Sequence, residues 1–243
     1  MEIKSFPSVI TPELAEETGW HIGDGSMNYY EKHDGKEKCV YQLRGHIEDD
    51  KEHYINRIKP IFKILYNVDI SLREMPSTRV FGFQIWSNAL FRFKESLGLR
   101  RGPKLELVIP DAFLLSNKIK AAVLRGIFDT DGCVYFVKKK LSMYPRMEIC
   151  TISLKLAEQL RVLFNELGLR ATMYKDSAPR GNRHQSYRVV IRGKEMFDRF
   201  MEVIGPKNSK HIKKYLLYRK GFKRFLISNN NNEPVVQPGR TLL

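Results

Sequence analysis

Residues 124–132 read Leu-Arg-Gly-Ile-Phe-Asp-Thr-Asp-Gly, an apolar stretch with helical spacing that stops on two aspartates and a glycine. Glycine is common where a helix ends, because it tolerates the left-handed backbone conformation. Aspartate is unfavourable there, because the C-terminal end of a helix already carries partial negative charge. The stretch therefore predicts that a cation belongs at this helix end.

The stretch has a partner near the start of the chain. Residues 13–30 and 121–136 align at an offset of 107 residues, which pairs Asp24-Gly25 with Asp131-Gly132. Small residues recur at every fourth position on both segments: Ala15 and Gly19, then Ala122 and Gly126. A stripe of small side chains along a helix lets another backbone approach closely. The two segments are therefore predicted to be helices that pack on each other through these four residues.

The repeat continues beyond the two helices. After each Asp-Gly come two strand-like runs, an amphipathic helix (about 49–66 and 154–167), two more strands and another helix. Thr11 and Ser116 are suited to cap the two motif helices. The pattern predicts an α+β protein with two pseudo-symmetric αββαββα halves, residues 1–110 and 111–227. Residues 228–243 are polar and contain proline, so we expect a mobile tail.

The charge of the chain points to a polyanionic partner. Its formal net charge is +15 and its pI is near 9.7, and the excess is spread along the whole sequence. No apolar run reaches the roughly 20 residues of a membrane span, and the start lacks a secretory signal. We therefore expect an intracellular protein that binds nucleic acid and no membrane. Three cysteines without a C-x-x-C spacing indicate neither a disulfide framework nor a zinc site.

These features together resemble the LAGLIDADG homing endonucleases, in the single-chain form with two motifs. The stretch 124–132 is close to the family motif, and residues 14–25 are a diverged copy that keeps Leu14, Ala15, Gly19, Asp24 and Gly25. The resemblance covers about residues 11–220. It implies that the motif helices pack at the centre of the molecule and that two antiparallel four-stranded sheets form a DNA-binding saddle.

The resemblance also implies a metal-dependent catalytic centre. Asp24 and Asp131 would meet at the base of the saddle and, with Gly23 and Thr130, hold a divalent cation. Carboxylate oxygens favour Mg²⁺, with Mn²⁺ as a plausible substitute. Asp129 is expected to serve the structure near the helix end instead, because the first half has Ile22 at the equivalent position.

Two lysines are further catalytic candidates. Gly-Pro-Lys occurs once in each half and ends at Lys104 and at Lys207. In the family, basic residues flank the metal ions and stabilise developing charge, so the resemblance implies this role for both lysines. The alternative is that Gly-Pro only ends a helix and that each lysine is an exposed surface charge.

Alternation along the strands identifies candidate DNA contacts. Side chains at odd and even positions of a strand face opposite sides, so polar residues that alternate with apolar ones are predicted to form an open face. The alternative for any one of them is a solvated surface charge or a phosphate contact. Alternation gives Gln42, Arg44, His46, Gln84 and Trp86 in the first half, and Arg146 and Glu148 in the second. Further candidates lie on or beside the second-half strands: Lys138, Lys140, Arg180, Arg183, Arg188 and Arg192.

The resemblance implies a sequence-specific endonuclease that cuts both strands of a long site in double-stranded DNA. Two unlike halves in one chain imply a monomer and a site that is asymmetric. Two alternatives stay open on the same fold: an RNA-splicing maturase, for which RNA would be a partner, and a DNA-binding protein that does not cleave. The chain lacks the Cys or Ser start and the His-Asn finish of protein splicing, so we expect an intron-encoded or free-standing enzyme.

Overall fold

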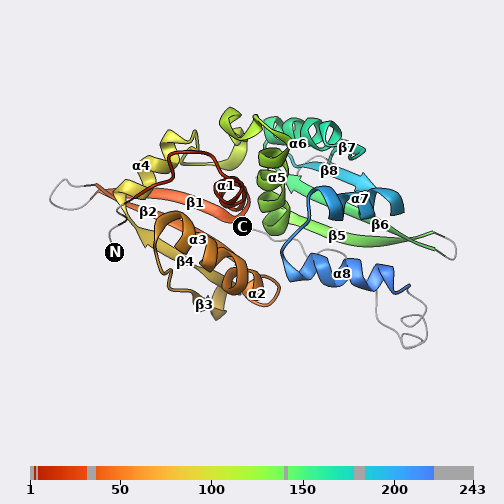
Figure 1. Ribbon diagram of the computed structural model, residues 1–243, viewed down its shortest axis with the longest axis horizontal. Coiled ribbons are helices and arrows are strands. Elements are labelled where there is room, and N and C mark those ends of the chain that lie inside the picture. The colour runs from red at the N-terminus through yellow and green to blue at the C-terminus, as the bar shows by residue number, and fades with distance from the viewer. Residues whose placement is uncertain (1–2, 4, 32–36, 140–141, 178–183, 222–243) are drawn as a thin grey trace.

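The protein consists of two similar α+β halves that lie side by side (Figure 1). The computed structural model describes residues 3, 5–31, 37–139, 142–177 and 184–221. The predicted tail, 228–243, lies outside these residues. Among the helices of the described part, none is long and apolar enough to cross a membrane.

Each half follows the order of elements that the sequence predicts. The first half contains α1 (Pro12–Asp24), β1 (Gly25–Glu31), β2 (Glu37–His46), α2 (Lys51–His53), η1 (Tyr54–Ile58), α3 (Lys59–Tyr66), β3 (Arg73–Met75), η2 (Pro76–Thr78), β4 (Val80–Trp86) and α4 (Asn88–Ser96). A linker with two short 3₁₀ turns, η3 (Lys104–Glu106) and η4 (Asp111–Leu114), leads to the second half. The second half contains α5 (Asn117–Asp131), β5 (Gly132–Lys139), β6 (Ser142–Thr151), α6 (Leu154–Glu166), β7 (Ala171–Lys175), β8 (Tyr187–Arg192), α7 (Lys194–Val203) and α8 (Ser209–Arg219).

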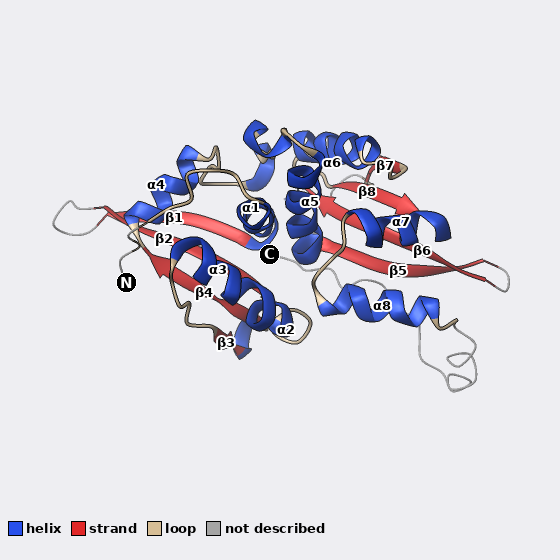
Figure 2. Ribbon diagram, in the orientation of Figure 1, coloured by secondary structure: helices blue, strands red, loops and turns tan. Residues whose placement is uncertain are grey.

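The strands form two antiparallel four-stranded sheets, ordered β1-β2-β4-β3 and β5-β6-β8-β7. Helices α3 and α4 lie over the first sheet, and α6 and α7 lie over the second (Figure 2). The side chains beneath these helices form one continuous hydrophobic core that extends through both halves. The predicted fold class, two pseudo-symmetric αββαββα halves, is confirmed. The boundary between the halves stays a prediction.

Two elements of the first half differ in detail from the prediction. The helix expected over about 49–66 contains the π-helical turn η1, where the N–H of Lys59 donates to the carbonyl of Tyr54. Pro60 follows at once, and since proline has no N–H, the regular ladder of hydrogen bonds is interrupted there. The third strand is also short, because Val68 and Ile70 pack into the core before pairing with β4 begins at Arg73.

Helices α1 and α5 pack against each other at the centre of the molecule, where both sheets meet them (Figure 1). Thr11 and Ser116 cap them as predicted, since their hydroxyls accept from the N–H groups of Leu14 and Ile119. A Cβ atom at Gly19 would lie 2.3 Å from the carbonyl oxygen of Val123. The two backbones are thus in direct contact, which only glycine allows.

The backbone of α5 at Gly126 likewise contacts the backbone of α1. A Cβ atom there would lie 2.1 Å from the carbonyl oxygen of Glu16 and 2.9 Å from the Cα atom of Gly19. Ala15 and Ala122, one turn earlier on each helix, are fully buried. The stripe of small residues therefore forms the seam between the two halves.

Replacing Gly19 by alanine should destabilise the protein strongly. The new methyl group would press on backbone atoms that cannot move alone, and the expected loss is about 3 kcal/mol in the free energy of unfolding. Urea unfolding measures it. Gly102→Ala is the control, because nothing lies within 4 Å of its Cβ position, and only its positive φ of 97° causes strain, expected to cost about 1 kcal/mol. Equal losses for both variants would contradict close packing at Gly19.

Candidate active site

The packing of α1 on α5 brings their C-terminal ends together. A Cβ atom at Gly23 would lie 1.9 Å from the Thr130 hydroxyl oxygen and 3.4 Å from Cγ of Asp131. The carboxyl group of Asp131 thus lies over the last turn of α1, next to Asp24. Asp24 and Asp131 are the last residues of the two helices, so their charges add to the partial negative charge of two helix ends.

The electrostatics of this point favour a cation. Desolvation raises the pKa of Asp24 well above its usual value, and the negative charges of Asp131 and Asp50 raise it further. The pKa of Asp131 is raised for the same main reason, desolvation, whereas Lys104 and Lys210 oppose the shift. Asp131 is nonetheless exposed at the surface, and Asp24 is half-buried, so both are accessible from solvent. Two neighbouring carboxylates that repel each other are stabilised when a cation binds between them.

Lys104 lies against the end of α1. Its Nζ donates to the carbonyl oxygens of Ile22, at 3.3 Å, and of Gly23. In the second half the equivalent carbonyl, that of Thr130, accepts from Nζ of Lys210 at 3.4 Å. Since Gly23 and Thr130 are equivalent in the repeat, Lys104 and Lys210 are structural counterparts.

The structure therefore places Lys210, and not the predicted Lys207, at the end of α5. The side chain of Lys207 is exposed, and the group it directs to α5 is its backbone N–H, which donates to both carboxylate oxygens of Asp129. Lys207 also does not appear among the charges that shift the pKa of Asp24 or Asp131, whereas Lys104 and Lys210 do. The repeated Gly-Pro-Lys is misleading because the chain after Gly205-Pro206 turns along α5 for three more residues before a lysine reaches the helix end.

Asp129 has a structural task, as the sequence predicts. Its carboxylate is completely buried and accepts three hydrogen bonds from the backbone N–H groups of Lys207 and Asn208, at 2.9–3.1 Å. Burial raises the pKa of Asp129 to about 7, and the N–H donors act in the opposite direction by stabilising the charged form. Asp129 thus fixes the segment that leads to Lys210.

Three residues of the site were missed from the sequence: Lys210, Asp50 and Asn208. The Asn208 amide donates to Oδ1 of Asp50 at 2.7 Å and to the carbonyl of Asp129 at 2.9 Å. Oδ1 of Asp50 also accepts from Nζ of Lys210 at 2.8 Å, and its Oδ2 accepts from the N–H of His46. A buried Asp at the start of α2 thus holds a lysine of the other half. The only signal in the sequence was an acidic pair before a helix, which is typical of a helix start.

The residues present fit a small divalent cation. Among the described residues, no group of three or more His, Cys, Asp and Glu side chains converges as a metal site. The candidate site therefore rests on the two carboxylates together with the carbonyls of Gly23 and Thr130. No hydrogen bond from a described residue reaches the carboxylates of Asp24 or Asp131, so both can act as ligands. Oxygen donors of this kind suit Mg²⁺ or Mn²⁺.

The first sheet has the open face that alternation predicts. Gln42, Arg44 and His46 lie opposite to the buried Tyr41 and Leu43. On β4 the same face carries the neighbouring candidates, Gln84 and Trp86. The Gln42 amide donates to the side-chain oxygen of Gln84 at 3.3 Å, and Nζ of Lys38 lies 4.3 Å from the centre of the Trp86 ring. This face offers amide, aromatic and cationic groups.

The second sheet has an open face of arginines. Arg146, Arg188 and Arg192 lie opposite to the buried Met147 and Ile149. Lys138 is exposed but shares its strand face with the buried Val134, so it lies on the other side of the sheet from Arg146. The remaining candidates, Lys140, Arg180 and Arg183, lie outside the described residues.

The prediction that Glu148 is an accessible DNA contact needs a correction. Glu148 shares the open face, yet it is only 4% exposed, because side chains of the two neighbouring strands cover it. Its Oε2 accepts from the Tyr135 hydroxyl at 2.7 Å, and its Oε1 accepts from Nη1 of Arg188. Alternation predicts which face a residue is on, but not whether a longer neighbour covers it. Glu148 is therefore not available as a direct DNA contact.

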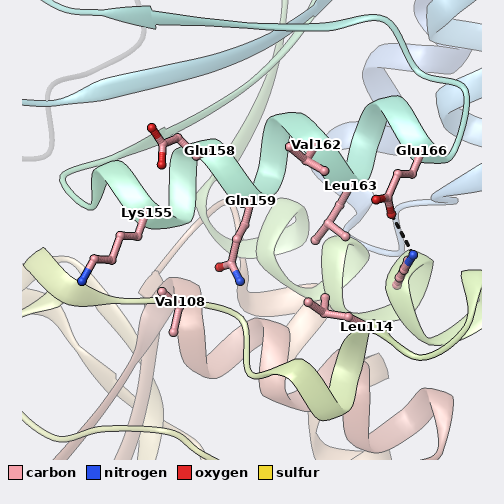
Figure 3. A pocket seen from close by; sticks show the side chains of 9 residues that line it. Val108, Leu114, Lys155, Glu158, Gln159, Val162, Leu163 and Glu166 are labelled. Carbon is pink, nitrogen blue, oxygen red and sulfur yellow. Dashed lines mark hydrogen bonds and ion pairs between the residues drawn. The ribbon is translucent and has the colours of Figure 1, made fainter.

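A groove in the described structure lies away from this site. It runs between α6 and the linker (Figure 3) and is lined by Val108, Leu114, Gln159, Val162 and Leu163, with charged residues at its rim. One of these, Glu166, pairs with Lys120 at 2.7 Å. No residue from the C-terminal ends of α1 and α5 lines this groove, so the groove is not part of the candidate site.

Comparison with solved structures confirms the fold. A structure of mesophilic variants of the homing endonuclease I-DmoI matches with a TM-score of 0.58 and 17% identity, covering 79% of this chain and 95% of that chain. I-DmoI in complex with DNA and Ca matches with a TM-score of 0.59 and 17% identity (81% and 91%). The LAGLIDADG homing endonuclease I-LtrWI bound to target DNA matches with a TM-score of 0.58 and 12% identity (89% and 91%).

Comparison of sequences finds a similarity to a protein family in the second half of the chain. A family model described as a LAGLIDADG-like domain matches residues 118–205, from α5 to the end of α7. Two curated proteins of Methanocaldococcus jannaschii also match: a glutamine–fructose-6-phosphate aminotransferase, 24% identical over 82% of this chain, and a replication factor C small subunit, 27% identical over 84%. The chain spans only 17% and 10% of their lengths. Since their named activities are unrelated, the similarity lies in a shared segment.

Removing one charge of the aspartate pair should stabilise the metal-free protein at neutral pH. A carboxyl whose pKa is raised by folding favours the folded state while protonated, and this contribution is lost as pH rises through the raised pKa. Asp24→Asn should therefore be more stable than the original protein at about pH 8, with a smaller difference at about pH 5. Urea unfolding with a chelator present measures this. A difference that does not change with pH would contradict the raised pKa.

Proposed function

We propose that this chain, a LAGLIDADG protein with two motifs, is a divalent-metal-dependent endonuclease that cuts both strands of a long asymmetric DNA site as a monomer. The observation that carries the proposal is the convergence of Asp24 and Asp131 on one point between two basic open sheets, with Lys104 and Lys210 beside them. Related folds support it, since structures of I-DmoI include complexes with DNA and Ca or Mn.

The residues of the centre match what phosphodiester hydrolysis requires. Asp24 and Asp131, with the carbonyls of Gly23 and Thr130, would hold the cation. A divalent cation supplies Lewis acidity and neutralises charge on the phosphate. Lys104 and Lys210 each lie at one of these carbonyls, so each amino group is placed to stabilise negative charge that develops on the phosphate as a water molecule attacks. The near-equivalent halves offer one such lysine to each strand.

The surroundings suit double-stranded DNA. The net charge of +15 attracts phosphates, and the open faces carry the donors and acceptors that base edges in the major groove require. The two faces differ in chemistry: the first has the Gln42–Gln84 amide pair, and the second has arginines. Different faces in one chain favour a site whose two halves differ in sequence.

The aspartate pair is tested by selecting cleaved duplexes from a randomised library in Mg²⁺. Asp24→Asn and Asp131→Asn should each lower the cleavage rate by at least about 100-fold, because each removes a ligand charge from the centre. Asp111→Asn is the matched control, since Asp111 is an exposed acid on the linker. Cleavage that survives both site variants would refute the centre. Sequence-specific binding without cleavage in Mg²⁺ or Mn²⁺ would support the non-cleaving alternative.

The lysine assignment is tested by Lys210→Met and Lys104→Met. Each should slow single-turnover cleavage by about 10- to 100-fold, because a charge stabiliser is lost at the reacting phosphate. DNA affinity should fall by less than about threefold, because one phosphate contact among many is lost. Asp50 keeps its bonds from Asn208 and His46 when Lys210 is replaced.

Lys207→Met provides the comparison for this pair, because it removes the same charge three residues away. Its cleavage rate should stay within about twofold of the original protein, as expected for a surface charge. A slow Lys207 variant beside an active Lys210 variant would reverse the assignment.

A further inference from the structure

One group on the open face of the second sheet is unusual for a surface that binds a polyanion. Arg188, on β8, lies between two carboxylates, Glu148 on β6 and Asp176 just after β7. Its Nη1 donates to Oε1 of Glu148, and its Nε donates to Oδ1 of Asp176 at 2.7 Å. The guanidinium is thus held on two sides, by residues from two different neighbouring strands.

We call the two carboxylates that hold Arg188, those of Glu148 and Asp176, the clamp. Each of them is itself held by a further hydrogen bond. Oε2 of Glu148 accepts from the Tyr135 hydroxyl at 2.7 Å, and Oδ2 of Asp176 accepts from the Ser186 hydroxyl at 2.7 Å. The side chain of Glu148 is 5% exposed, whereas that of Arg188 is 40% exposed. Glu148 therefore lies beneath the guanidinium, whereas Arg188 and Asp176, whose side chain is 29% exposed, both reach the surface.

The clamp leaves Arg188 able to bind a ligand. A guanidinium has five N–H donors, and the bonds to Glu148 and Asp176 use one on Nη1 and the one on Nε. Among the residues that the structure describes, no further acceptor takes the donors on Nη2. Three donors remain, and two parallel ones are enough for a bidentate contact to O6 and N7 of guanine.

The charge around Arg188 favours a base edge over a phosphate as its ligand. One guanidinium and two carboxylates give the cluster a net charge of −1, which weakens attraction to a phosphate. The acceptors on a base edge are neutral, so they are not repelled to the same degree. An isolated surface ion pair adds little stability. Stability alone therefore does not explain why two fixed carboxylates lie on a surface that faces DNA.

Arg192, four residues later on the same strand face, is the natural contrast. Its Nη1 donates to the hydroxyls of Tyr174 and Thr172, and its guanidinium lies 4.6 Å from the centre of the Tyr174 ring. None of the ion pairs in the described part of the chain includes Arg192. No paired carboxylate therefore offsets its positive charge, which suits a phosphate contact.

We propose that Arg188, held by Glu148 and Asp176, is a preorganised reader of one guanine in the half of the DNA site that lies on the second sheet. Glu148 and Asp176 are positioning residues that fix the guanidinium before DNA binds. Because the side chain is already ordered, little entropy is lost when the contact forms, which strengthens it. The fixed direction of the donors matches the two acceptors of guanine and not those of the other bases. The inference rests on the proposed DNA-binding function and adds the base that this residue selects.

The test is selection of bound duplexes from a randomised library with the full chain in a chelator, which measures binding without cleavage. The original protein should select a G·C pair at one position of the second half-site by about 10- to 100-fold over other pairs. Arg188→Ala should remove this preference and leave the other positions unchanged. Glu148→Gln should reduce the preference at the same position, while affinity for unselected DNA stays equal or rises because a negative charge is lost.

Arg192→Ala is the matched control. It should weaken binding to all sequences alike, reduce the salt dependence of binding by about one phosphate contact, and keep the base preferences. Circular dichroism and thermal melting show whether each variant is folded. The same uniform loss for Arg188→Ala would overturn the proposal and make Arg188 a phosphate contact. A lower melting temperature with unchanged base preferences would also overturn it and make the clamp a structural ion pair.

The outcome separates this inference from the proposed function. If the selected duplexes are cleaved in Mg²⁺ but Arg188→Ala keeps the guanine preference, only the inference fails. If they are bound with an Arg188-dependent guanine preference but are never cleaved, the endonuclease proposal fails and the inference stands. Absence of any sequence preference would overturn the inference as well.

Discussion

The direct contact between the backbones of α1 and α5 is the constraint on which the rest of the molecule depends. At Gly19 and Gly126 there is no room for a side chain between the helices. This contact sets the position of each half relative to the other and brings the ends of both helices to one point. Two helix ends and two aspartates then concentrate negative charge there, which the fold offsets with lysines. The geometry of the seam and the chemistry of the centre therefore have the same origin.

A second set of contacts determines which lysine reaches that point. Asp129 binds the backbone of the segment after α7, and Asn208 links it to Asp50 of the first half. Lys210 then lies between Asp50 and the end of α5. Asp129 thus does not act at the centre itself. It orders the segment of chain that places the amino group of Lys210 there. Glu16 adds a further tie between the halves, since Arg57 and Arg125 both donate to it.

The two open faces show how one repeat can support an asymmetric surface. The first sheet places an amide pair and a lysine over tryptophan where the second places arginines, tyrosines and a covered glutamate. Beneath both faces the sheets bury similar alternating apolar residues. The core thus constrains one side of each strand, and the other side is free to diverge between the halves.

Much of the fold could be predicted from the sequence, because it follows from patterns between residues that are close along the chain. Helical spacing, strand alternation and small-residue stripes depend on local periodicity, so they determined the α+β repeat and the helix seam. The meeting of Asp24 with Asp131 was implied by the resemblance of the two motifs to a known family. Tertiary structure decided what depends on the path of the chain and on neighbouring strands. Lys210 replaces Lys207 because Asp129 fixes the backbone between them, and Glu148 is covered because Arg188 and Tyr135 cross it. No spacing in the sequence records contacts between residues that are distant along the chain.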